Sequence, residues 1–216
     1  MANTLDIDYK NLLSDVIELG VDKNDRTGTG TRSIFGATIR HKMSDGFPIL
    51  TTKKVAFNTM VTELKWFLRG DTNIKYLVDN GCNIWNGDAY KRYCKLQVPN
   101  DHFETQEEFI KLIKTKDEFA KKWGELGPIY GKQWRDINGI DKLENLITGL
   151  ISNPNGRRHL VDSWNVDELD EMTLPPCHYS FQCYVADGKL SLMWNQRSAD
   201  LFLGVPFNIS SYGLLL

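Results

Sequence analysis

The segment TLPPCHYSFQCYV, residues 173–185, places a cysteine directly after two prolines and directly before a histidine. The reactive form of cysteine is the thiolate, and a free thiol with a pKa of about 8.5 is only slightly ionised at neutral pH. Because free cysteines are most often buried and inert, packing is the simpler interpretation. The prolines favour the other one, since they lack an N–H and hold Cys177 outside regular strand pairing, at an exposed turn. From this segment alone Cys177 is either an inert thiol or a candidate nucleophile, whereas packing is the better explanation for Cys183 within the strand.

Three further polar residues could take part in the same chemistry. His178 is either a catalytic base or a hydrogen-bonding residue beside the site. Glu63 lies among apolar residues in TELKWFL, where it is either a solvated helix residue or a carboxyl placed for proton transfer. Asn208 follows Pro206, so it could simply form a turn, but its amide donates and accepts at once, which suits an imide such as uracil.

Arginines could hold an anion near the thiol and favour the thiolate. Arg26 adjoins the glycine-rich DRTGTGTRS, which lacks the standard phosphate-loop patterns, so a flexible turn is the alternative. Arg157 and Arg158 are adjacent and would point to opposite faces of a strand, so they meet one anion only from a loop or from different chains; otherwise they are solvated surface cations. Arg197 and Ser198 end an apolar run, where an unpaired arginine is costly, so we expect a buried anion there.

The elements that must position these residues are predicted from apolar periodicity. Helical spacing predicts helices over residues 5–20, 55–70, 73–80 and 140–151, with a polar helical excursion over 87–124. Residues 26–43 alternate weakly, as strands do, and two alternating runs flank Asp187-Gly188, a strong hairpin signal. The apolar segment NISSYGLLL follows. The pattern predicts an α+β fold with a mostly antiparallel or mixed sheet.

Composition narrows the class of protein. A length of 216 residues suits one domain, which we expect over 1–216. The formal net charge is -2, without a long run of one sign, so we expect the protein to bind neither nucleic acid nor membrane. Charges interrupt the N-terminal apolar residues, which excludes a signal peptide there. The cysteines have no metal-ligand spacing, so we expect free thiols, no metal and a cytoplasmic protein.

Several motifs together resemble the thymidylate synthase family from about residue 6 to the end: NDRTGTGT, FPILTTKK, WFLRGDTNIKYL, LGPIYGKQWR, RRHLVDSWN, LPPCH and QRSADLFLGVPFNISSY. The resemblance implies a mixed β-sheet core flanked by helices. It also implies the reductive methylation of dUMP to dTMP, with 5,10-methylenetetrahydrofolate as co-substrate and dihydrofolate as product. The resemblance further implies a homodimer, in which Arg157 and Arg158 cross into the partner's site.

The resemblance assigns roles to single residues. Cys177 matches the nucleophile that adds to C6 of the pyrimidine. Glu63 matches the carboxyl that manages protons at O4, Tyr130 matches a residue of the later proton removal from C5, and Asn208 matches the partner of the uracil imide. The residues that match the dUMP site are Arg26, Arg157, Arg158, His178, Gln196, Arg197, Ser198, Asp200 and Asn208. Those that match the folate surface are Lys53, Ile84, Trp85, Asp200 and Leu203.

The chain also departs from the family pattern. Asn86 and Asp88 stand where many members have an acidic residue and an aromatic or asparagine, and Asn195 replaces a usual tyrosine. The family chain continues beyond FNISSYGLL with elements that bind the deoxyribose and close over folate. We therefore expect a polypeptide that ended at Leu216 to be nearly inactive.

Two alternatives follow from the same motifs. One is a dUMP or dCMP hydroxymethylase of the same fold; Asn208 and Trp85 favour a uracil substrate and hydride transfer over it. The other is a truncated, non-catalytic remnant that dimerises or binds a nucleotide.

Overall fold

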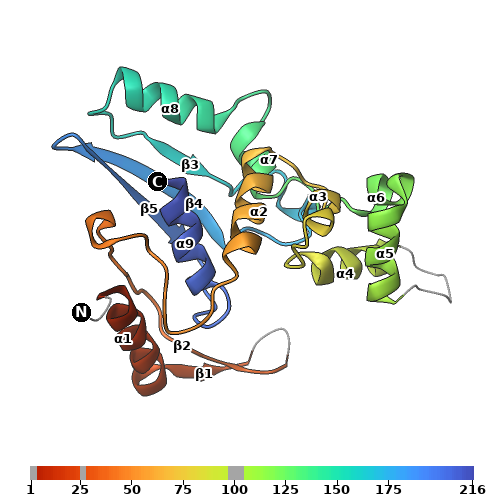
Figure 1. Cartoon of the computed structure of the whole chain (residues 1–216), viewed down its shortest axis with the longest axis horizontal. Helices are drawn as coiled ribbons and strands as arrows, with labels where there is room; N and C mark the ends of the chain where they lie inside the picture. Colours follow the sequence, from red (N-terminus) through yellow and green to blue (C-terminus); the bar gives the residue numbers. More distant parts are fainter. Residues whose placement is uncertain (1–3, 25–27, 97–104) are drawn as a thin grey trace. The chain divides into compact units, whose positions relative to one another are not determined.

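The computed structural model describes residues 4–24, 28–96 and 105–216. These residues form two compact units. The chain up to Phe57 forms the first unit together with Asp200–Leu215, and Asn58–Ala199 with Leu216 form the second. Figure 1 labels the helices and strands of both units.

The first unit contains α1 (Thr4–Leu19), β1 (Val21–Lys23), β2 (Thr31–Ser33), a short 3-10 turn (Met43–Asp45) and α9 (Val205–Leu215). As predicted, α1 ends just before Gly20. Polar contacts fasten both helices to the segment 48–51. Asp6 accepts hydrogen bonds from the backbone N–H of Thr51, at 2.8 Å, and from its hydroxyl. The hydroxyl of Ser210 in α9 donates to the carbonyl of Pro48 at 2.9 Å.

Residues 26–43 form less strand than their alternation predicts. In the described part of this segment, which begins at residue 28, only Thr31–Ser33 pairs with another strand, the antiparallel β1. Gly28, Gly30 and Gly36 have φ angles of 76°, 83° and 83°. A residue with positive φ interrupts an extended chain, so the glycines explain the shortened strand. The segment NISSYGLLL forms most of α9.

The second unit contains the remaining helices: α2 (Phe57–Leu68), α3 (Lys75–Asp79), α4 (Asn86–Leu96), α5 (Gln106–Thr115), α6 (Asp117–Trp123), α7 (Tyr130–Arg135) and α8 (Lys142–Ser152). In the described part of the polar segment 87–124, which leaves out residues 97–104, the chain forms α4, α5 and α6. These helices pack around Tyr93, whose ring lies 4.9 Å from Phe109 and 5.1 Å from Trp123 between centroids. Thr105 and Glu108 form a capping box that starts α5. The excursion therefore has an aromatic core of its own.

The second unit also contains an antiparallel sheet in the order β3 (Leu160–Asp162), β4 (His178–Ala186), β5 (Lys189–Gln196), visible in Figure 1. The hairpin between β4 and β5 turns at Asp187 and Gly188, with φ angles of 51° and 68°, which confirms the hairpin prediction. The described strand pairs are all antiparallel. Helices and small antiparallel sheets together confirm the predicted α+β class.

Buried aromatic residues connect the elements that carry the candidate site of the second unit. Phe67 of α2 packs on Trp134 of α7 with 5.6 Å between ring centroids, and Trp134 packs on Phe181 of β4 at 5.4 Å. All three side chains are buried. This stack fixes α2, α7 and β4 against one another, and each of them holds or adjoins a candidate catalytic residue.

Candidate active site

Cys177 lies immediately before β4 and is partly exposed, whereas Cys183 within β4 is buried. The backbone N–H of Cys177 donates to the hydroxyl oxygen of Tyr130 at 2.9 Å. Its carbonyl accepts from the backbone N–H of Arg197 at 2.9 Å. The N–H of Cys177 is thus satisfied by a side chain and not by a strand, in agreement with the effect expected from the two prolines.

Glu63 is a buried carboxyl in α2. Its Oε1 accepts a hydrogen bond of 2.8 Å from the indole N–H of Trp85, a residue that is only 5% exposed. Burial raises the pKa of Glu63 from 4.5 to about 7, although the bond from Trp85 lowers it. The solvated-helix interpretation of Glu63 is therefore wrong. A carboxyl with this pKa can give and take a proton near neutral pH.

Tyr130 begins α7, and its ring lies between those of His178 and Trp85. The His178 ring stacks on it at 4.3 Å, and Trp85 meets it edge-on at 6.0 Å. Burial raises the pKa of Tyr130, and the nearby Cys177 raises it further. Burial lowers the pKa of His178 to about 3, so its imidazole stays neutral at neutral pH. A neutral, stacked histidine of such low basicity fits the structural interpretation of His178 better than that of a base.

Arg197 is exposed just after β5. Its Nε donates to the carbonyl of Pro176 at 2.9 Å and its Nη2 to that of Pro175 at 3.0 Å. The guanidinium is held by the same two prolines that precede Cys177, which keeps a cation beside the thiol loop. Ser198 follows it on the surface, and Gln196 at the end of β5 pairs with His178 across the hairpin.

The other predicted site residues of the second unit lie in loops and helix starts. Arg157 and Arg158 are both exposed in the loop between α8 and β3. Ile84 is exposed, but the ring of Trp85 is buried against Trp66 and Tyr130. The contact that Trp85 makes in the structure is thus with Glu63 and its aromatic neighbours.

The first unit carries the remaining predicted residues. Lys53 Nζ donates to the carbonyl of Phe202 at 2.6 Å and lies over its ring at 4.0 Å. Asp200 accepts from the backbone N–H of Phe202 at 2.9 Å and of Leu203 at 2.7 Å, and Leu203 is exposed. Asn208 lies partly buried in the first turn of α9.

One predicted residue of the first unit is outside the structural description. Arg26 belongs to residues 25–27, which the described ranges do not include.

The departures from the family pattern have local explanations at two of the three positions. Asn195 Nδ2 donates to the hydroxyl of Ser180, its cross-strand partner, at 3.2 Å. Asn86 is buried and donates to Asn83 Oδ1 at 3.2 Å, while its own Oδ1 has no hydrogen-bond partner among the described residues. Nothing in the structure explains Asp88, in the first turn of α4.

The sequence did not predict two polar residues beside the site, Gln133 and Glu168. Gln133, within the motif LGPIYGKQWR, is only 1% exposed, and its side-chain amide donates to the Glu168 carboxylate at 2.6 Å. The only signal in the sequence is a glutamine flanked by lysine and tryptophan three residues after Tyr130, which does not by itself predict burial.

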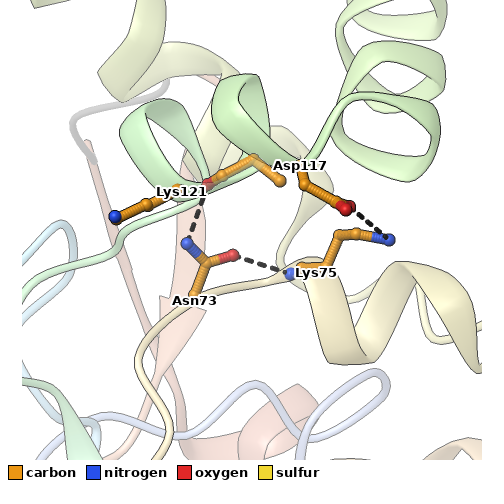
Figure 2. Close-up of a pocket in the computed structure, with 5 residues that line it drawn as sticks. Asn73, Lys75, Asp117 and Lys121 are labelled. Carbon is orange, nitrogen blue, oxygen red and sulfur yellow. Dashed lines mark hydrogen bonds and ion pairs between the residues drawn. The ribbon is translucent and has the colours of Figure 1, made fainter.

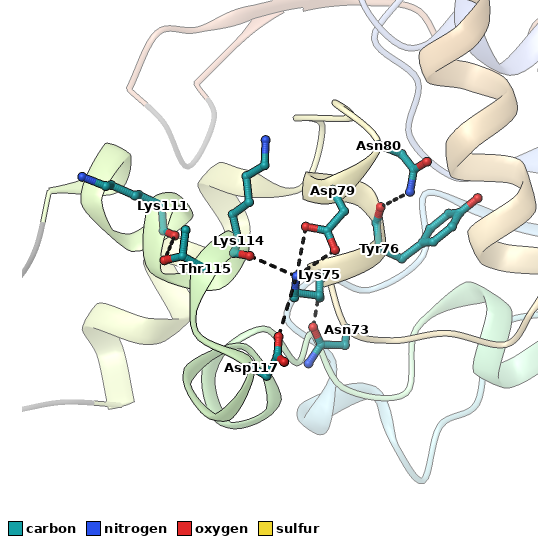
Figure 3. A network of polar contacts seen from close by, with 9 residues as sticks. All are labelled: Asn73, Lys75, Tyr76, Asp79, Asn80, Lys111, Lys114, Thr115 and Asp117. Atoms are coloured by element: carbon teal, nitrogen blue, oxygen red, sulfur yellow. Dashed lines mark hydrogen bonds and ion pairs between the residues drawn. The ribbon is translucent and has the colours of Figure 1, made fainter.

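A hollow of about 290 Å³ lies away from the predicted site residues. It is lined by Asn73, Lys75, Asp117, Ala120 and Lys121, and Figure 2 shows Asn73 bonded to the α6 backbone at its edge. Figure 3 shows that the Lys75 ammonium donates hydrogen bonds to Asp79 and to the carbonyl of Lys114 and forms an ion pair with Asp117. The lysine is thus satisfied by the protein, and the network ties α3 to α5 and α6.

The described residues contain neither a metal-binding group nor a membrane-spanning helix. In residues 4–24, 28–96 and 105–216, His, Cys, Asp and Glu side chains form no group that could hold a metal ion. None of the helices within these ranges combines the length and apolar character needed to cross a lipid bilayer.

The fold is of the α+β class, and in its second unit a partly exposed cysteine lies beside a buried tyrosine and near a buried carboxyl. The family model described as thymidylate synthase matches residues 7–216, across both units. The chain belongs to the thymidylate synthase family.

Similar proteins agree with this assignment. The chain is 52% identical over 208 residues to a thymidylate synthase of Mycoplasma genitalium, and 52% identical over 208 residues to one of Mycoplasma mobile. It is 51% identical over 210 residues to the thymidylate synthase of Aster yellows witches'-broom phytoplasma. Each match covers 96% of this chain and 72% of the relative. The family consists of methyltransferases that act in dTMP biosynthesis, with methylenetetrahydrofolate as co-substrate.

Proposed function

We propose that this protein converts dUMP to dTMP by reductive methylation and that Cys177 is the nucleophile. The observation that carries the proposal is the bond from the Cys177 N–H to the Tyr130 hydroxyl, at 2.9 Å. It puts a partly exposed thiol beside a buried phenol, and that phenol is close enough to Glu63 for an electrostatic interaction with its carboxylate. A nucleophile, a phenol and a carboxyl titrating near pH 7 are the groups that the reaction requires.

The reaction begins when the Cys177 thiolate adds to C6 of the pyrimidine ring. The S–C6 bond forms, and the electrons of the C5–C6 double bond make C5 nucleophilic, with charge spread to O4. Glu63, whose pKa is about 7, relays protons at O4. The co-substrate supplies a one-carbon unit and a hydride and leaves as dihydrofolate. Tyr130 takes part in removing the proton from C5, and the thiolate of Cys177 is finally released from C6.

In the proposed dUMP site, some residues bind the phosphate and others bind the uracil base. Arg26, Arg197 and Ser198 are the proposed phosphate ligands. Support for Arg197 is that its guanidinium is exposed and oriented by two carbonyls. Asn208 reads the uracil imide, because its amide can satisfy O4 and N3–H together. His178, Gln196 and Asp200 complete this site as proposed partners.

The proposed folate surface is less aromatic than the residue types imply. Ile84 and Leu203 expose apolar side chains of the kind that a pterin ring packs on. Lys53 and Asp200 provide charge beside Leu203. Because the Trp85 ring is buried, we assign Trp85 chiefly to orienting Glu63, to which its indole donates.

We also propose a cytoplasmic homodimer. One face of the antiparallel sheet exposes apolar side chains from all three strands: Leu160 is 49% exposed, Tyr184 60% and Met193 56%. A second copy of this face would cover them, and exposed Arg157 and Arg158 near the start of β3 would then be available to the partner's phosphate site. All four cysteines are free, as in a reducing compartment.

The test is a covalent adduct with 5-fluoro-dUMP in the presence of methylenetetrahydrofolate. Fluorine at C5 cannot leave as a proton does, so the complex should stay attached to Cys177. Mass spectrometry should find it on the peptide that contains Cys177, and Cys177→Ser should abolish it. Cys94→Ala, which changes another free thiol that is not fully buried, is the matched control and should retain it. A protein that forms no adduct and makes no dTMP would contradict the proposal, and a hydroxymethylated product would favour the hydroxymethylase.

A further inference from the structure

Two loops bring Tyr130 and Cys177 together. Residues 126–129 lead into α7 and end at Tyr130, while residues 165–176 lead from β3 towards Cys177. The bond between the Cys177 N–H and the Tyr130 hydroxyl joins positions 47 residues apart. Its geometry therefore depends on how firmly the two loops are held to each other.

The backbones of the two loops are in direct contact. The carbonyl of Leu126 accepts from both the N–H and the hydroxyl of Thr173, at 2.8 Å and 2.7 Å. Gly127 has a φ of 83°, and a Cβ placed on it would collide with the carbonyl of Glu171. A glycine is therefore required on both counts, and any side chain there would push the loops apart.

Gln133 joins the same two loops through its side chain. Its amide nitrogen donates to the carbonyl of Pro128 at 2.7 Å and to Glu168 Oε2 at 2.6 Å. Since both partners are acceptors, turning the amide over would place oxygen against two oxygens, so only one orientation is favourable. Glu168 Oε2 also accepts from Asn165 Nδ2 at 2.9 Å, which orients the carboxylate.

The loop that leads to Tyr130 starts from a fixed point. Asn73 Nδ2 donates to the carbonyl of Ala120 at 2.8 Å and to Glu125 Oε1 at 2.9 Å, and the first of these bonds is drawn in Figure 2. The next residue, Leu126, donates from its N–H to the carbonyl of Thr72 at 3.1 Å. Because Leu126 is fixed at the start of the loop, the loop can shift mainly near Pro128, whose carbonyl Gln133 binds.

We propose that Gln133 and Glu168 are positioning residues, which hold the Tyr130 hydroxyl against the Cys177 N–H. Because that N–H donates to the phenol oxygen, the phenol's own proton must point to another acceptor. A shift of either loop would change both the direction of this proton and the setting of the thiol. The inference rests on the proposed function for the role of Tyr130, but the geometry can be tested without it.

The first test measures geometry. In Glu168→Ala, we expect the amide hydrogen of Cys177, followed by NMR, to exchange with solvent at least about tenfold faster than in the wild type, because its acceptor moves. Glu168→Gln should restore protection, since an amide oxygen still accepts from Gln133. Asp170→Ala removes an exposed carboxylate from the same loop and should exchange like the wild type. Unchanged exchange at Cys177 in Glu168→Ala would overturn the proposal whatever the activity.

The second test measures the reaction. Glu168→Ala should lower kcat, and the release of tritium from dUMP labelled at C5, by roughly 10- to 100-fold, with the KM for dUMP within about threefold of the wild type. Adduct formation with 5-fluoro-dUMP, which needs no proton removal from C5, should reach wild-type extent. A merely structural role would lower all of these in proportion to the folded fraction. If Glu168→Ala folds poorly, Asn165→Ala applies the same test with a smaller effect.

The two proposals fail in different ways. If the wild type forms no adduct and releases no tritium, the proposed function fails, while the exchange measurement still judges the positioning. If the wild type is active and Glu168→Ala matches it in kcat and in exchange, the positioning proposal fails alone.

Discussion

At the residue scale, burial determines the protonation of Glu63. The carboxyl has one hydrogen bond to Trp85 and a pKa near 7 in the folded protein, against an ordinary value of 4.5. The folded state therefore binds this proton more tightly than the unfolded state. The stabilisation is fully present below about pH 4.5 and is lost as the pH rises through about 7.

Glu63→Gln should remove this pH dependence. From pH 5 to pH 8, the free energy of unfolding of the wild type should fall relative to that of the variant by on the order of 3 kcal/mol at most. Urea unfolding of both proteins at the two pH values measures the difference. His178, whose folded pKa is depressed, acts in the opposite direction, but it is present in both proteins and cancels. Parallel profiles would show that Glu63 is not the titrating group.

Tyr130→Phe should leave the Cys177 N–H without its acceptor. We expect a loss of stability of up to about 3 kcal/mol, because a partly buried donor loses its hydrogen bond, together with a large fall in kcat. Chemical denaturation and dTMP formation measure the two effects. Tyr184→Phe, which removes a hydroxyl from an exposed ring, is the control. A fully active Tyr130→Phe would contradict the role proposed for the phenol.

The sequence predicts where a single residue lies relative to the strands better than it predicts the hydrogen-bond partners of that residue. The two prolines predict that Cys177 lies outside regular strand pairing, and the structure places it there. The hydrogen-bond acceptors of Arg197 could not be predicted, because they are the backbone carbonyls of Pro175 and Pro176, some 20 positions away. Backbone carbonyls are present at every position, so no residue type indicates which of them will hold a guanidinium.

At the element scale, α7 can approach α2 only because residue 131 has no side chain. A Cβ on Gly131 would lie 2.5 Å from the carbonyl oxygen of Phe67 and 2.9 Å from its Cα. Those are backbone atoms of α2, so they cannot turn aside. Tyr130 and Glu63 therefore keep their places through a backbone contact between the two helices.

Gly131→Ala should lower the free energy of unfolding by about 1–3 kcal/mol, because the helices must separate. Gly87→Ala in α4 is the matched control: a Cβ there meets nothing within 4 Å, so we expect it to be neutral or to stabilise by up to about 1 kcal/mol. Denaturant unfolding of both variants gives the comparison. Equal stabilities would show that α2 and α7 are not packed as described.

Helices were more predictable than strands for a physical reason. A helix such as α1 or α2 repeats its apolar face within the element, whereas a strand is decided by the partner that it pairs with. The glycines at positive φ in residues 28–36 break an alternation that the sequence presents as continuous. In α8, Ile147 and Ile151 share the predicted apolar face, yet both are exposed, since only the part of this face around Leu143 is buried.

At the scale of the whole molecule, the open face of the sheet bears on the proposed dimer. Tyr184→Lys combined with Met193→Lys should shift the protein from dimer to monomer in sedimentation velocity, because charges would replace the apolar centre of the contact. Ile151→Lys changes an apolar residue of α8 that is more exposed than either, and it should leave the assembly unchanged. A double variant that remains dimeric would place the interface elsewhere.

The hairpin of β4 and β5 determines which residues stand beside the thiol. The bond from the Arg197 N–H to the Cys177 carbonyl closes its open end, next to the pair His178 and Gln196. The number of residues in the two strands thus determines how the Cys177 thiol and the Arg197 guanidinium are placed relative to each other. One residue added within a strand would turn Arg197 to the opposite face of the sheet, whereas residues added at the tip, beyond Ala186 and Lys189, would not. Length variation in this protein should therefore be tolerated at the tip of the hairpin and excluded from its strands.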